Sequence, residues 1–196
     1  MCGKVICLSC LIVAGVVSVQ EGQAAADISP NETKAVRGTT VAARPELAGV
    51  VLRDELIDFE IRNAAGKVVF AGKVQDRVSQ SNQQKTLSFI FRIRNTNPDL
   101  PGRITEVRRK GFGGWKTDVD YRLDGLGTIG PDSFKRDPKG MTVGFSFGKT
   151  PVTPGAESRF CFVLTDAAGF DAKAGSLVII ADDGSKVTLQ VAAPKK

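Results

Sequence analysis

Three stretches of the chain alternate between apolar and polar residues, and this period of two constrains the fold more than any other feature. In residues 86–97, one of the two sets that alternate from 87 to 94 is wholly apolar, with Leu87, Phe89, Phe91 and Ile93. The alternation returns twice, with Met141, Val143, Phe145 and Phe147 and then with Phe160, Phe162 and Leu164. Since successive side chains of a strand point to opposite faces, each stretch predicts a strand with one apolar face. We therefore expect two sheets that share an aromatic core containing Phe91, Phe145 and Phe162.

Shorter alternating runs separated by turn residues fill most of the remaining chain. Residues 57–61 and 68–70 predict one hairpin, and residues 177–181 and 187–191 predict another, closed by the Asp-Gly pair at 183–184. Further strands are expected at 104–108 and 119–123, whereas glycine and proline are dense enough in 124–139 to predict a loop. About ten short strands and no helix predict an all-β fold. The expected form is an antiparallel β-sandwich, immunoglobulin-like or jelly-roll-like, or a related barrel.

The 196 residues divide into three parts by composition. Residues 1–26 predict a signal peptide, with Lys4 before an apolar run of about 15 residues and a small-residue exit; a spanning helix needs about 20. Residues 27–45 are polar and lack a period, which predicts an irregular leader. Residues 46–196 predict a single sandwich domain. We expect a secreted or periplasmic protein with no transmembrane segment in the mature chain.

Cysteine and charge restrict the protein's chemistry only mildly. Three of the four cysteines fall in the first ten residues, so the mature chain keeps Cys161 alone and no internal disulfide is expected. Cys161 lies between two phenylalanines and is predicted to be a small buried group. The net charge of +6 comes from 27 basic and 21 acidic residues without a long basic run. This excess fits either an ordinary solvated surface or an anionic partner.

Histidine is absent from the sequence, and this excludes several kinds of catalytic site. Neither a Ser-His-Asp nor a Cys-His nucleophilic site can form, and the usual zinc and copper centres lose their commonest ligand. The acidic run 118–125 resembles a calcium loop only in part, because Arg122 stands where a third acidic ligand belongs. We interpret Asp118 and Asp120 as outward residues of a strand. No metal or cofactor is therefore expected, and no enzymatic activity.

The best candidate for a binding site is a basic, glycine-rich stretch at residues 108–116, which is predicted to be a loop. It holds the single tryptophan of the chain among four basic residues. Cations beside an exposed aromatic ring suit an anionic polysaccharide; nucleic acid is not an expected partner of an exported protein. The alternative is that the aromatic rings tuck under the sheet edge. The predicted ligand-binding residues are Arg108, Arg109, Lys110, Phe112, Trp115 and Lys116.

Five short motifs resemble, in their order, uncharacterised secreted bacterial β-sandwich proteins, some of which end in a PEP-CTERM sorting tail. The motifs are residues 91–95, 118–121, 143–147, 154–158 and 165–166, so the resemblance covers roughly residues 55–192. It implies the sandwich fold but brings no activity. The sequence printed here ends Ala193-Pro194-Lys195-Lys196 without the apolar anchor of the tailed members.

Two functions from different classes are compatible with the sequence. The first is an exported, non-enzymatic β-sandwich that binds an anionic polysaccharide or serves as a component of the envelope or matrix. The second is a small carboxylate-dependent hydrolase on a jelly-roll scaffold, which needs two inward carboxylates across an open groove. The ligand and the oligomeric state are not determined by the sequence.

Overall fold

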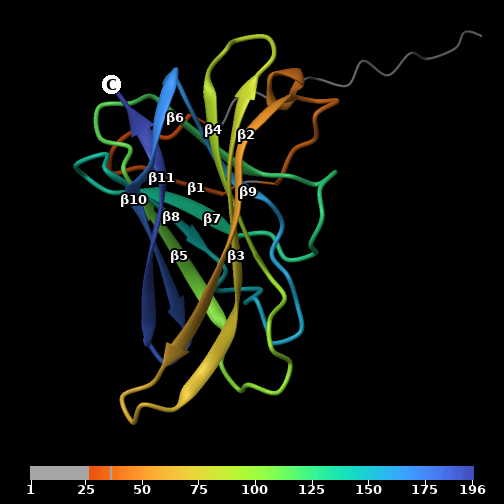
Figure 1. Ribbon diagram of the computed structural model, residues 1–196, viewed down its shortest axis with the longest axis vertical. Helices are drawn as coiled ribbons and strands as arrows, with labels where there is room; N and C mark the ends of the chain where they lie inside the picture. Colours follow the sequence, from red (N-terminus) through yellow and green to blue (C-terminus); the bar gives the residue numbers. More distant parts are fainter. Residues whose placement is uncertain (1–26, 36) are drawn as a thin grey trace, which may run out of the picture.

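The computed structural model describes residues 27–35 and 37–196 and is built from two antiparallel sheets (Figure 1). The six-stranded sheet has the order β1-β7-β8-β5-β10-β11, and the five-stranded sheet has the order β2-β3-β4-β9-β6. This confirms the predicted all-β sandwich. The strands are β1 Thr33–Ala35, β2 Gly49–Arg62, β3 Val68–Ser81, β4 Leu87–Arg94, β5 Ile104–Lys110, β6 Thr117–Tyr121, β7 Ser133–Arg136, β8 Thr142–Ser146, β9 Cys161–Thr165, β10 Gly169–Ala181 and β11 Lys186–Lys195.

Phenylalanine rings from both sheets meet in the space between them. The predicted central strand, β4, buries Leu87, Phe89, Phe91 and Ile93 completely. The Phe91 ring meets the Phe145 ring of β8 edge-on, with 4.9 Å between centroids, and Phe145 meets Phe134 of β7 at 5.0 Å. Edge-to-face contacts of this kind add to the free energy gained from burial. The predicted places of Phe91 and Phe145 are confirmed.

Strand β9 buries both of its faces, which the sequence did not predict. Cys161 and Val163 pack into the core between the sheets, whereas Phe162 and Leu164 belong to a separate cluster with Leu47. The prediction that Phe162 points into the shared core is therefore wrong, although its side chain is buried. The reason is a cover on the outer side: the short 3₁₀ helix Pro45–Leu47 contributes Leu47 to this second cluster.

Two segments that were predicted to be irregular pair with each other. Strand β1 lies in the predicted leader and β7 lies in the predicted loop 124–139, and they pair in the register Lys34 to Phe134. Ile28, also in the leader, is 2% exposed and packs in the main core. The predicted signal peptide, 1–26, lies outside the described residues. Among the described residues, no helix has the length and apolar character needed to cross a bilayer.

Both predicted hairpins form, and their strands are longer than predicted. Strand β2 pairs with β3 along its whole length, with a bulge at Leu52, and β10 pairs with β11. Strand β2 is an edge of the five-stranded sheet, as β11 is an edge of the six-stranded sheet. Figure 1 shows the β2–β3 turn projecting at one end of the molecule.

Candidate functional site

The first three residues of the predicted binding loop are the end of strand β5. Arg108 pairs with Gly144 of β8 on one side and with Val178 of β10 on the other. Because side chains alternate across a strand, Arg108 and Lys110 lie on the outer face, and both are exposed. Arg109 points the opposite way. The prediction of one continuous exposed loop is therefore wrong.

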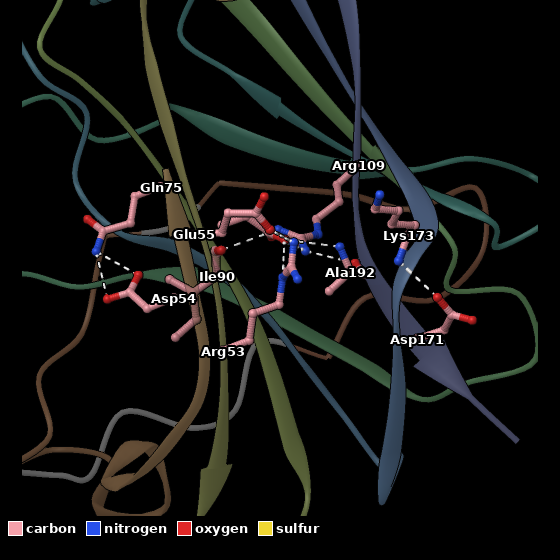
Figure 2. Close-up of polar contacts among 10 residues, drawn as sticks. Arg53, Asp54, Glu55, Gln75, Ile90, Arg109, Asp171, Lys173 and Ala192 are labelled. Carbon is pink, nitrogen blue, oxygen red and sulfur yellow. Dashed lines mark hydrogen bonds and ion pairs between the residues drawn. The ribbon is translucent and has the colours of Figure 1, made fainter. Parts of the chain in front are cut away.

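Arg109 is fully buried between the sheets, where it joins strands of both of them (Figure 2). Its Nη2 donates to Asp76 Oδ1 at 2.7 Å and to the carbonyl of Ala192 at 2.8 Å, and its Nη1 donates to the carbonyl of Ile90 at 3.3 Å. Burial lowers the pKa of Arg109, and the charge of Asp76 opposes that shift. A side chain in this position cannot touch a ligand outside the protein, so Arg109 is removed from the candidate site.

Phe112 is also buried completely and is removed from the site for the same reason. Its ring meets the Phe89 ring edge-on, with 5.9 Å between centroids. The turn before it depends on Gly111, which has a φ of 124° and leaves so little space that a Cβ would lie 2.6 Å from the Cβ of Ala193. The alternative that an aromatic ring tucks under the sheet is thus correct for Phe112.

Trp115 and Lys116 remain at the surface and line a groove of about 380 Å³. Trp115 is half-buried and Lys116 is exposed. The groove is also lined by Ser29 and Pro30 of the N-terminal segment and by Lys139, in the turn between β7 and β8. The groove therefore combines the single indole ring of the chain with two exposed ammonium groups.

Arg136 holds the walls of this groove together from beneath. It is 5% exposed, and its guanidinium donates to carbonyl groups of Ile28, Trp115 and Gly140 at 3.0, 2.9 and 2.9 Å. Burial lowers the pKa of Arg136, and Asp137 partly opposes this shift. Sequence reasoning missed Arg136, because Ile28 and Trp115 are distant from it in the chain and backbone carbonyl groups leave no side-chain signal.

A second groove, of about 470 Å³, lies on the outer face of the six-stranded sheet. Gly144 forms part of its floor, between Lys135 of β7 and Arg108 of β5 in the sheet register. Lys110 lines the groove further along β5. Arg108 is held by Glu106 through two hydrogen bonds of 2.7 Å, which raise the pKa of Arg108.

The two grooves lie on either side of one short turn. Asp137 and Pro138 line the second groove, and Lys139 and Gly140 line the first. The side chain of Asp137 accepts hydrogen bonds from the backbone N–H groups of Met141 and Thr142, which fixes the turn. We call the exposed cations on both sides of this turn the basic rim: Arg108, Lys110, Lys116, Lys135 and Lys139.

The first two acidic residues of the run 118–125 lie on β6 and are covered by another part of the chain. Asp118 and Asp120 lie away from the main core, as predicted, but they are only 6% and 3% exposed because residues 38–46 cover them. Arg44 donates to Asp118 at 3.1 Å, and Thr39 hydrogen-bonds to the backbone of Tyr121. In the part of the chain that the structure describes, no group of three or more metal-ligating side chains is placed to hold an ion.

Burial raises the pKa of two titratable groups in this region, Asp120 and Cys161. Burial raises the pKa of Asp120 to about 6, against hydrogen bonds from the backbone of Tyr121 and Gly38. Burial, with the nearby charge of Asp120, raises the pKa of the Cys161 thiol. A thiol that is buried and protonated is a poor nucleophile, so Cys161 is a packing residue, as predicted.

Comparison with known proteins does not assign the chain to a family. No protein-family model, no curated protein and no solved structure matches the chain. The resemblance to secreted bacterial β-sandwich proteins therefore stays a prediction, and function has to be argued from the grooves themselves.

Proposed function

We propose that the chain is an exported, non-enzymatic β-sandwich that binds an anionic polysaccharide through the basic rim and Trp115. The observation that carries this proposal is the gathering of five exposed cations around the 137–140 turn, beside the single tryptophan. Three of the six residues expected from the sequence are cations of this rim: Arg108, Lys110 and Lys116. Lys135 and Lys139 join them through the fold.

The chemistry of the rim suits carboxylate or sulfate groups on sugar rings. Ammonium groups pair with such anions without fixed geometry, whereas Trp115 offers a flat apolar face for a sugar ring. Glu106, Asp137 and Asp27 also line the two grooves and reduce the positive charge. We therefore expect moderate affinity that depends on salt, because exposed charges are screened over about 8 Å at physiological ionic strength.

Trp115 emission gives a direct test, since no other tryptophan contributes to the signal. The purified chain is titrated at low salt with heparin, alginate and a neutral glucan. The proposal predicts a saturable change with at least one of the two anionic polymers, reversed by added salt, and none with the glucan. No change with either anionic polymer contradicts the proposed site.

Two double variants that remove the same charge at different places distinguish binding at this site from nonspecific attraction of an anionic polymer to a basic protein. Lys116→Ala with Lys139→Ala removes both lysines beside Trp115, and we expect it to weaken polymer binding at least threefold. Lys67→Ala with Lys173→Ala removes the same charge from the β2–β3 turn and from β10, outside both grooves, and should leave the affinity nearly unchanged. Equal losses in the two double variants would show that only net charge matters.

The hydrolase alternative has no specific support. The groove of about 560 Å³ lined by Asp58 and Glu60 takes both acids from the one edge strand β2, and Asp58 pairs with Lys73 at 2.6 Å. Asp76 is a carboxylate that is fully buried between the sheets, and it forms an ion pair with Arg109. Neither arrangement is the pair across an open groove on which that alternative depends.

A further inference from the structure

The second groove follows strand β8 along the outer face of its sheet. Strand β8 lies between β7 and β5 (Figure 1), and its residues Thr142 and Gly144 line the floor of the groove. In the sheet register, Lys135 of β7 and Arg108 of β5 stand opposite Gly144 on its two sides. Because neighbouring strands lie about 4.8 Å apart, the two wall strands are about 10 Å apart. A groove of this width accepts one unbranched chain.

Gly144 keeps this groove open, since a side chain at this position would rise between the walls. Its backbone does not require glycine: its φ is not in the left-handed region, and the pairing on both sides is regular. A Cβ there would lie 3.2 Å from Glu106 Oε1, the end of a flexible side chain, and 3.7 Å from the carbonyl oxygen of Lys135. Glycine inside a strand marks a bulge, a tight bend or the close approach of another backbone or a ligand. At Gly144 the structure leaves the ligand.

The unpaired cations of the groove stand on opposite walls. Lys135 is opposite Gly144, and Lys110 of β5 is opposite Thr142. Both lysines are exposed, and neither ammonium group pairs with a carboxylate in the part of the chain that the structure describes. Their offset of two residues is about 6.7 Å along β8, on the order of the length of one sugar ring. A chain laid along β8 therefore meets one cation at each of its edges.

Each wall also carries an acid, which limits the charge that a ligand can bring. Glu106 holds Arg108 through two hydrogen bonds of 2.7 Å, and Asp137 lines the groove near its end. A polymer with several sulfate groups on each repeat would place some of them beside these carboxylates, and like charges in contact are costly. One carboxylate on each ring reaches Lys110 or Lys135 without that cost.

We propose that the second groove binds a single unbranched polyuronate chain, laid along β8 over Gly144. This inference rests on the proposed function and names the polymer and its path. In a flat chain whose successive rings are turned over, the one carboxylate of each ring alternates between the two edges, so that successive carboxylates pair with Lys135 and Lys110. A longer chain crosses the 137–140 turn and brings a further ring to Trp115.

Substitution of Gly144 tests the path without changing any charge. Calorimetry with mannuronate oligomers should show binding at least tenfold weaker for Gly144→Val and at least threefold weaker for Gly144→Ala. Gly148→Val adds the same side chain just beyond β8 and outside both grooves, where a Cβ meets only Ser146 Oγ at 3.6 Å, and should leave the affinity unchanged. Valine suits a strand, so thermal unfolding should not weaken. If Gly144→Val fails to fold, Gly144→Ala alone carries the test, because only the end of Glu106 has to move.

Heparin oligomers with the same number of rings test the class of polymer. At physiological ionic strength the mannuronate oligomers should bind more tightly than the heparin oligomers. Tighter binding of heparin would overturn the assignment to a polyuronate.

The outcomes separate this inference from the proposed function. If Gly144→Ala and Gly144→Val fold and bind like the wild type, while Lys116→Ala with Lys139→Ala weakens binding, the polymer lies elsewhere on the basic rim and this inference fails alone. If no anionic polymer binds the wild-type chain, this inference and the proposed function both fail.

Discussion

Asp120 is a carboxyl group whose removal from water should make stability depend on pH. Its pKa is about 6 in the folded protein, whereas the ordinary value for an aspartate, which we take for the unfolded chain, is 3.8. Between these values the folded chain binds more protons than the unfolded chain, so this group's contribution to stability falls as pH rises toward 6 and stays low above it. The difference corresponds to a penalty on the order of 3 kcal/mol at neutral pH.

Asp120→Asn should remove that penalty, but part of the gain is offset because the amide is itself a buried polar group. The amide keeps an oxygen to accept the Tyr121 N–H, now bonded at 2.8 Å. We expect the free energy of unfolding to rise by about 1–2 kcal/mol near pH 7 and to change little near pH 4. Chemical denaturation at the two pH values measures this. A loss of stability that is the same at both would mean that the charged form of Asp120 is not penalised.

The buried pair of Arg109 and Asp76 should be costly to break from one side. Arg109→Met leaves Asp76 with Arg53 at 3.2 Å as its remaining cation, so we expect a loss of about 3 kcal/mol or more. Asp76→Leu with Arg109→Met removes both charges and should lose less than the sum of the single changes. Denaturation of the four chains gives the coupling; additive losses would show that the two groups are energetically independent.

At the scale of elements, Arg136 connects the β7–β8 turn, the Trp115 loop and the N-terminal segment. Arg136→Lys keeps the charge but cannot supply the planar fork that reaches four carbonyl groups, those of Ile28, Phe112, Trp115 and Gly140. We therefore expect a red-shifted, more quenchable Trp115 emission. The fold should survive, because the aromatic core is elsewhere. Iodide quenching measures the exposure of the indole; quenching identical to that of the wild type would mean that Arg136 does not position the loop.

Strands with clear alternation were predictable, and strands defined by a distant partner were not. The pattern of β4 has one apolar face against a core and is visible in the sequence as a period of two. Strands β1 and β7 are three and four residues long and form because partners distant in the sequence or across a turn supply their backbone bonds: β1 pairs with β7, and β7 also pairs with β8. Strand β9 misled the prediction, since both of its faces are covered and alternation carries no information there.

The candidate site was predicted only in part for a related reason. The composition of the sequence located the basic stretch. However, strand β5 continues to Lys110 and therefore places Arg109 between the two sheets, where it pairs with Asp76, 33 positions away in the chain. Nothing near Arg109 in sequence indicates that pairing. Lys135 and Lys139 joined the rim through β7 and β8, which bring their turn next to Trp115.

For the whole molecule, the structure bears on where a signal peptide could be removed. Ile28 is in the core and Asp27 bridges to Asp118, so a cut beyond this point would remove packed residues. We predict that secreted material begins near Asp27, which N-terminal sequencing of culture medium or periplasm determines. A mature chain that begins well inside the sandwich, or an uncut chain retained in membranes, would refute the expected export.

The most direct test of the account is a lysine footprint of the bound polymer. An amine-reactive label is applied to the chain with and without the anionic polymer that changes Trp115 emission, and each lysine is scored by peptide mass spectrometry. Binding at the basic rim predicts slower labelling of Lys110, Lys116, Lys135 and Lys139, with Lys67 and Lys173 unchanged. Equal protection of all six lysines, or protection confined to Lys67 and Lys173, would contradict it.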